Sequence, residues 1–493
     1  MQKSSIHTRR ARPIASGLAV VLCGLLVIPE PAPPPPPPSP ERPFHWNQDE
    51  VWLALEQRFR EARAAGCPGL SAPIDSGLEL GSRFLTHLPG RLVSPDAPVL
   101  DSIEHNTFAL AALVAGCLER LPEYVRLVTE TRSAVKRQSE HWDLETAKDR
   151  LYRILFGGRA ALEEVMLQAP PETVPALVSG DDEPSRTPST RMLGVTIHSG
   201  DLLVSRGGAP VSALVAVGND YQGNFSHVAL VHVDEKTGLP SVIESSEKTG
   251  VHVSSIEDYL NNVKLRVMIL RPRADLAPMI ADPMLPHRAA ALALGRARRR
   301  HIPYDFAMDH RDDSKMYCSE VPAWAYRQLG VRLWMDISRI SAPGTRRWLA
   351  DLGVEWFDPR EPSDLEYDPQ LRVVAEWRDP HTLYMDHVDN VVTEAMLDGA
   401  AGGDRLTHTW YALPVVRLLK GYSIVLNAVG KTGPVPEGMN ATVATRFHAL
   451  GHRHSEITQR VLAMAEEFQG SMGYRPPEWQ LVRMAKQARD ETR

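Results

Sequence analysis

Between residues 190 and 330, short apolar segments alternate with turn signals, and this pattern constrains the fold of the 493-residue chain more than any other. Val, Ile and Leu dominate the segments, and turn-forming groups such as Lys236-Thr237-Gly238 separate them. Short strands joined by tight turns most simply form an antiparallel sheet. The pattern predicts strands at 202–204, 225–233, 241–245, 250–253 and 265–270.

Two helices are expected after these strands, at about 286–300 and directly after Cys318. In the second helix, Glu320 suits the positive end of the helix dipole, and Pro322 is tolerated in the first turn. Gly330 is a natural stop. A thiol at a helix start ionises more easily, and the thiolate is the reactive form of cysteine. Cys318 is therefore a candidate nucleophile, although a free cysteine is also a common small buried residue.

A thiolate nucleophile needs a general base close by and a group that orients this base. Histidine is the base suited to neutral pH, and His227 is the candidate because it lies at the start of a predicted strand. Strand alternation puts His232 on the opposite face. Glu244 lies in an otherwise apolar strand, where a carboxylate usually has a partner, since burying a lone charge is costly. An edge carboxylate that faces water is the alternative.

The order of five short motifs resembles a known family. The motifs are GDL at 200–202, SHVALV at 226–231, VIES at 242–245, PYD at 303–305 and YCSE at 317–320. This order resembles the circularly permuted NlpC-type papain-like hydrolases, in particular their YiiX-like branch, in which the histidine strand precedes the cysteine helix. The resemblance covers about residues 190–330. It implies an α+β fold, in which a permuted papain-like domain, a small antiparallel sheet packed on the nucleophile helix, has flanking helical domains.

The resemblance also implies a role for each matched residue. Cys318 would be the nucleophile, His227 the general base, Glu244 the third polar residue, and Tyr304 a residue near the oxyanion site. The implied activity is that of a cysteine hydrolase of the amidase or peptidase type, which works through a covalent thioester and takes cell-wall peptides among its substrates. A lipid or ester acyl hydrolase or acyltransferase of the same fold stays open, as does a catalytically inactive binding protein.

The expected partner is therefore an acyl-containing substrate: a peptide, a cell-wall fragment or a lipid. The net charge of −6 gives no reason to expect nucleic-acid binding. No cofactor is implied by the matched motifs.

A metal-binding protein is the competing class, because three histidines lie near one another in the C-terminal region. A helix would place His448 and His452 on one face, where such pairs bind zinc, and His454 follows closely. However, the acid of the HExxH pattern is missing, and Arg446 and Arg453 lie among the histidines. An ordinary surface helix with no metal is the favoured interpretation.

The N-terminus has the pattern of a targeting segment. Residues 1–12 contain four basic residues and no acid, and an apolar run of 15 residues follows at 14–28. This length suits a signal-peptide core and is short for a membrane span. We expect residues 1–28 to be a signal peptide or an anchor, which would contact the membrane. The rest of the chain would be exported to the periplasm or the cell envelope.

Composition divides the remainder of the chain. A polyproline segment is extended and does not join a core, and Pro-, Ser- and Asp-rich stretches read as linkers. The pattern predicts a proline-rich linker at 29–43, a helical domain at 44–168 and a second linker at 169–189. The permuted papain-like catalytic domain is expected at 190–331, and a mostly helical extension at 332–493.

Within the extension, the stretch 410–429 is apolar but contains Arg417, Lys420 and Asn427. These polar groups make a bilayer span costly. An amphipathic helix, either buried against the domain or lying on a membrane, fits better.

The predicted helical domain contains Cys67 and Cys117. In an oxidising compartment they could form a disulfide. Two separately buried thiols are equally compatible with the sequence, which does not give their separation.

Overall fold

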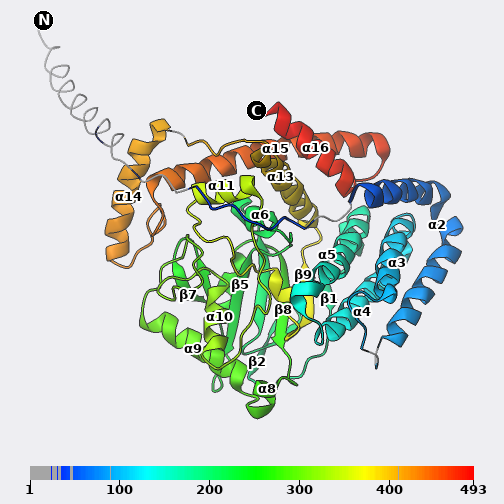
Figure 1. Ribbon diagram of the computed structural model, residues 1–493, viewed down its shortest axis with the longest axis horizontal. Coiled ribbons are helices and arrows are strands. Elements are labelled where there is room, and N and C mark those ends of the chain that lie inside the picture. Colours follow the sequence, from blue (N-terminus) through cyan, green and yellow to red (C-terminus); the bar gives the residue numbers. More distant parts are fainter. Residues whose placement is uncertain are drawn as a thin grey trace, which may run out of the picture.

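The computed structural model describes residues 24, 30, 35–44, 48–88, 90, 92–408 and 410–492 (Figure 1). The targeting prediction for residues 1–28 lies, apart from Gly24, outside these residues.

A seven-stranded sheet forms the centre of the molecule. Its strands are β1 (Leu177–Ser179), β4 (Leu202–Gly207), β5 (His227–Val233), β6 (Pro240–Ser246), β7 (Gly250–Ser254), β8 (Lys264–Pro272) and β9 (Leu371–Arg378). The order across the sheet is β1-β9-β8-β4-β5-β6-β7, and the strand pairings are antiparallel. A separate hairpin consists of β2 (Ser189–Met192) and β3 (Val195–His198). The antiparallel sheet expected from the alternating segments is confirmed.

Helices from three consecutive parts of the sequence surround the sheet (Figure 1). The first group is α2 (Gln48–His87), α3 (Pro98–Val114), α4 (Leu121–Ser139) and α5 (Leu144–Gln168), with the short η1 (Leu118–Arg120) and η2 (Pro171–Thr173). The second is α6 (Pro210–Val217), α7 (Ile256–Asn261), α8 (Ala277–Ala281), α9 (Leu285–Arg299) and α10 (Glu320–Arg327). The third is α11 (Pro343–Asp351), α12 (Asp364–Tyr367), α13 (Leu383–Ala401), η3 (Trp410–Ala412), α14 (Leu413–Ala428), α15 (Ala441–Met472) and α16 (Glu478–Glu491).

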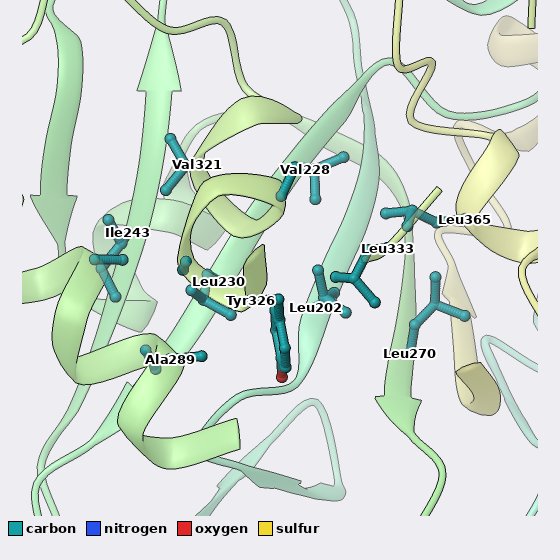
Figure 2. Close-up of a cluster of buried hydrophobic side chains, with 14 of the residues drawn as sticks. Leu202, Val228, Leu230, Ile243, Leu270, Ala289, Val321, Tyr326, Leu333 and Leu365 are labelled. Carbon is teal, nitrogen blue, oxygen red and sulfur yellow. The ribbon is translucent and has the colours of Figure 1, made fainter. Parts of the chain in front are cut away.

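Alternate residues of β5 pack into two different cores. Val228 and Leu230 pack with α9 and α10 in the cluster that Figure 2 shows. Ala229 and Val231 belong to a second cluster, together with residues of the β2–β3 hairpin and α7. Burial of one such large apolar side chain contributes about 1.5–3 kcal/mol. A register shift of one residue would exchange the two faces, so the apolar pattern holds β5 in place.

The turn before β4 brings the sheet and α9 into close contact. Gly200 has a φ of +100°, and a Cβ atom there would lie 2.3 Å from Cβ of Pro286 in α9. Only glycine fits this position. The neighbouring Asp201 accepts hydrogen bonds from Arg271 at 2.8 and 2.9 Å, so the Gly-Asp motif is part of the structural frame.

The helical region predicted over 44–168 contains α2 to α5, and a disulfide joins Cys67 of α2 to Cys117, which follows α3. Of the two alternatives that the sequence left open for these cysteines, the structure has the disulfide. It ties the middle of α2, next to Gly66, to the segment after α3.

Buried ion pairs join this helical layer to the sheet. Glu163 of α5 lies 2.7 Å from Arg266 of β8, 2.8 Å from Arg378 of β9 and 3.0 Å from His387 of α13. All four side chains are at least nine-tenths buried. Buried charges are tolerated when they are paired in this way. The helical layer and the sheet are therefore joined by specific ion pairs as well as by apolar packing.

Two of the predicted domain boundaries do not coincide with the limits of the sheet. The predicted linker 169–189 contains β1, and the predicted helical extension 332–493 contains β9, which lies between β1 and β8. The central sheet thus continues beyond residue 331. The strand pattern of β9 is obscured by Glu376 and Arg378, charged residues whose partners lie far away in the sequence. The apolar residues at 211–217, between β4 and β5, form helix α6.

Part of the proline-rich linker 29–43 is bound to the protein surface. Arg346 donates to the carbonyl oxygen of Pro37 at 2.7 Å, and the N–H of Phe44 donates to the carbonyl oxygen of Asp220 at 3.0 Å. A polyproline helix has no internal hydrogen bonds, so its carbonyl oxygens are free to accept such contacts. This part of the segment is therefore not a free spacer.

None of the helices formed by the described residues combines the length and the apolar content that crossing a membrane requires.

Candidate active site

Cys318, the predicted nucleophile, lies directly before α10 and is 6% exposed. Its sulfur lies 3.9 Å from the hydroxyl oxygen of Ser319, and both Ser319 and the backbone of Val228 lower the pKa of the thiol. The helix start predicted for the segment after Cys318 is confirmed, and Gly330, with a φ of +80°, follows the helix as expected.

His227, the predicted base, is the first residue of β5 and contacts both other members of the predicted triad. Its Nε2 atom lies 2.7 Å from Oε2 of Glu244, and the ring is close enough to the thiol of Cys318 for each group to shift the pKa of the other. His232 packs on the other face, with 5.0 Å between its ring centroid and that of His287 in α9. The alternation argument therefore distinguishes the two histidines correctly.

Glu244 is buried in the middle of β6, so the alternative of a solvent-facing edge carboxylate is wrong. The hydroxyl of Ser254 donates to Oε1 at 2.7 Å, and Nε2 of His252 lies 3.5 Å from the same oxygen. Burial raises the pKa of Glu244, but hydrogen bonds from His227, His252 and Ser254 outweigh this effect and hold the pKa below its ordinary value. Glu244 is thus an ionised carboxylate with partners on both oxygens.

The thiol and the imidazole shift each other's pKa in opposite directions. Burial lowers the pKa of His227, but its contacts with Cys318 and Glu244 raise it to about 9. Burial raises the pKa of Cys318, but the hydrogen bond and charge of His227 outweigh burial and leave the pKa lowered. The two shifts together favour a thiolate–imidazolium pair near neutral pH.

Tyr304 lies beside this pair, in the segment between α9 and α10. Its ring packs edge-on against Phe306, with 4.9 Å between the centroids. Burial, followed by the negative charge of Cys318, raises the pKa of Tyr304 well above its ordinary value, so the hydroxyl keeps its proton. No hydrogen bond joins Tyr304 to Cys318 among the residues that the structure describes. The structure therefore brings Tyr304 near the pair without a direct contact.

Sequence reasoning missed Ser254 and His252, which hold Glu244 from the adjacent strand β7. The register pairs Glu244 with His252, and Ser254 lies two residues further on the same face. The signal was present in the alternation of polar and apolar residues at 250–254. Recognising that these two residues contact Glu244 requires knowledge of how the residues of β6 pair with those of β7.

The segment before α12 also reaches the site, although it lies beyond the predicted catalytic domain. The N–H of Arg360 donates to the hydroxyl of Tyr317 at 2.9 Å. The neighbouring Glu361 is 5% exposed, and burial, with the nearby charges of Asp364 and Cys318, raises its pKa well above the ordinary value. The C-terminal region therefore forms part of the surroundings of Cys318.

The histidines of the alternative metal site do not converge. His448 and His452 are exposed on α15, whereas His454 is buried, 3.9 Å from Asp389. Within the part of the chain that the structure describes, no three His, Cys, Asp or Glu side chains are grouped so that they could hold a metal ion.

Comparison with known proteins agrees with this arrangement. Residues 196–340 match the family model of the permuted papain-like amidase enzymes, the YaeF/YiiX, C92 family. The crystal structure of metalloprotein YiiX from Escherichia coli O157:H7 has 19% sequence identity to the chain and a TM-score of 0.29; the match covers 36% of this chain and 97% of that one. No curated protein matches the chain. Over residues 196–340, the chain carries a domain of the permuted papain-like amidase family.

Proposed function

We propose that the protein is a cysteine-dependent acyl hydrolase of the amidase or peptidase type, with Cys318 as the nucleophile. The observation that carries the proposal is the continuous contact from Cys318 through His227 to Glu244, with 2.7 Å between the last two. The family match supports hydrolysis as the kind of reaction. A peptide or a cell-wall fragment is the substrate class that we propose.

The reaction begins from the ion pair. The Cys318 thiolate attacks the carbonyl carbon of the substrate, and the carbonyl oxygen takes up the negative charge. Glu244 stabilises the imidazolium of His227 and orients its ring. His227 then gives its proton to the leaving amine as the C–N bond breaks, which leaves a thioester on Cys318.

Two donors are available for the oxyanion. The backbone N–H of Cys318 has no hydrogen-bond acceptor among the described residues, and it lies at the start of a helix, where such groups are unsatisfied. The hydroxyl of Tyr304 stays protonated and is the second donor. Each donor of this kind typically contributes about 100- to 1000-fold to turnover.

Neutral His227 next removes a proton from water, which attacks the thioester. The acid product leaves, and the thiolate–imidazolium pair is restored. Ester substrates would follow the same steps with an alcohol as the leaving group.

A peptidyl probe with a thiol-reactive electrophile, followed by peptide mapping, tests the nucleophile, and hydrolysis of cell-wall peptides tests turnover. We expect the label on Cys318, and loss of both label and hydrolysis in Cys318→Ala. His227→Ala should lose hydrolysis as well. The matched control is His232→Ala, which removes the other histidine of β5. Hydrolysis by a folded Cys318→Ala variant would refute the proposal, and labelling without turnover would indicate a binding protein.

We further propose that residues 1–28 direct export of the chain and contact the membrane. The basic flank and apolar run support this proposal. A substrate in the cell wall would be accessible to a protein exported to the periplasm or the cell envelope. Fractionation of the producing cells, with protease accessibility of the catalytic domain, tests it.

A further inference from the structure

Helix α14 has its polar side chains turned toward the protein. Arg417, Lys420 and Ser423 are spaced three residues apart, so they lie along one side of the helix. Each of them is bonded to another part of the chain. The contacts are Arg417 to the carboxylate of Glu30 at 3.2 Å, Lys420 to the carbonyl oxygen of Pro436 at 2.9 Å, and the N–H of Val435 to the hydroxyl of Ser423 at 2.9 Å.

The opposite side of α14 is apolar and exposed. Of the seventeen large apolar side chains that are exposed in the described part of the chain, nine lie between 410 and 429. Those on the helix and at its end are between 40 and 65% exposed, and Trp410 and Tyr411, just before the helix, are 64 and 71% exposed. Ile424, four residues after Lys420, lies on the polar side of the helix. We call the other eight residues the α14 face: Trp410, Tyr411, Val415, Leu418, Leu419, Tyr422, Val425 and Val429.

This arrangement is the reverse of that in an ordinary surface helix, which turns its apolar side inward. A contiguous apolar surface on a folded protein marks an interaction site. The helix lies at the edge of the molecule, at the upper left of Figure 1, where a large flat partner can reach it.

The path of the N-terminal chain indicates which partner this is. Glu30 is held by Arg417 and by the N–H of Thr442 at 2.9 Å, so this residue lies beside α14. The apolar run 14–28 ends two residues before Glu30, within about 7 Å of extended chain. A bilayer that takes up this run therefore lies against α14.

We propose that the α14 face binds the interfacial region of a phospholipid bilayer, with the helix lying in the plane of the membrane. Its composition fits this partner, because Trp and Tyr favour the level of the headgroups while Val and Leu enter the acyl boundary. The exposed Lys431 follows the helix and suits anionic headgroups. Together with the N-terminal run, α14 makes a second attachment that orients the catalytic domain.

The test uses the full chain in vesicles of phosphatidylcholine and phosphatidylglycerol that contain a phospholipid with a photoactivatable acyl chain. Lipid adducts are mapped by mass spectrometry after irradiation. We expect adducts on peptides that cover 410–429 as well as 14–28. Peptides that cover α8 should carry none, although Ile280 there is 67% exposed.

The variant Leu418→Glu/Val425→Glu places two charges on the α14 face without disturbing buried contacts. It should lose most adducts at 410–429, keep those at 14–28 and keep the parent melting temperature. Ile280→Glu, an equally exposed apolar residue, is the matched control and should change neither set. Adducts at 410–429 no more frequent than at α8 in the parent would overturn the proposal. So would protection of the α14 face in a dimer of the chain, with adducts confined to 14–28.

Discussion

Nε2 of His227 lies 2.7 Å from Oε2 of Glu244, and the two residues come from neighbouring strands of the central sheet. The second oxygen of Glu244 is bound by Ser254 of β7. Three adjacent strands therefore set the orientation of the imidazole before any substrate arrives. A site built on strands holds its geometry more closely than one built on loops, which suits a group that must transfer protons in two steps.

The first prediction concerns the reactivity of Cys318. Because His227 lowers the pKa of this thiol, alkylation by iodoacetamide should follow an apparent pKa below the free-thiol value of about 8.5. His227→Ala should move the apparent pKa upward, since burial is then opposed only by the contacts with Val228 and Ser319. The measurement is the alkylation rate of Cys318 against pH, with mass mapping of the modified residue. An identical profile in the parent and in His227→Ala would contradict the ion pair.

The second prediction concerns the alkaline limb of the activity profile. His227 must be protonated to supply the leaving group, and its pKa is raised to about 9. Activity should therefore fall as the pH rises through about 9, because the imidazolium is lost. Glu244→Gln removes one cause of the raised pKa, so the limb should move to lower pH. The measurement is kcat/KM against pH, and an unmoved limb in Glu244→Gln would argue against the contact.

The candidate site residues that could be predicted from the sequence are those that a short local pattern identifies. His227, Glu244 and Cys318 lie in short segments with clear strand or helix patterns, and the order of these segments matched a family. Ser254 and His252 were missed because they act through a register that depends on the length of the β6–β7 turn. The same limit applied to the fold: β9 was not recognised, since Glu376 and Arg378 look like surface charges until their partners in other elements are known.

The orientation of α14 shows a further limit. An amphipathic pattern shows that a helix has two sides, and the spacing of Arg417, Lys420 and Ser423 marks the polar one. It does not show which side faces the protein. Here the polar side does, because its hydrogen-bond partners, Glu30 among them, come from distant parts of the chain.

The third prediction concerns stability. Glu163→Gln leaves Arg266 and Arg378 without their shared buried carboxylate, and breaking such a buried pair costs about 3–5 kcal/mol. Unfolding in urea should show a loss of this size. The control is Asp398→Asn, which removes the acid of an exposed pair with Lys486 and should cost about 1 kcal/mol or less. Equal losses in the two variants would mean that the buried pairs do not hold the layers together.

The fourth prediction concerns Ser254, which positions Glu244 from the side opposite His227. Ser254→Ala removes a hydrogen bond to a carboxylate, worth about 1.5 kcal/mol, so kcat should fall roughly tenfold. KM should stay unchanged, since Ser254 acts through Glu244. The control is Ser255→Ala, which loses the N-cap of α7 without touching Glu244. The idea fails if the two variants have the same steady-state kinetics.

The last prediction concerns Tyr304, whose role rests on proximity to Cys318 rather than on a hydrogen bond. Tyr304→Phe removes one donor and almost no volume, and the ring can still pack on Phe306. Loss of one oxyanion donor should lower kcat by about 100- to 1000-fold. KM should change little, because the interaction strengthens only as the oxyanion forms. Steady-state kinetics on a peptide substrate, with melting curves as a check on folding, measure this. Wild-type turnover in Tyr304→Phe would contradict this role. It would mean that a donor other than Tyr304 acts together with the Cys318 N–H.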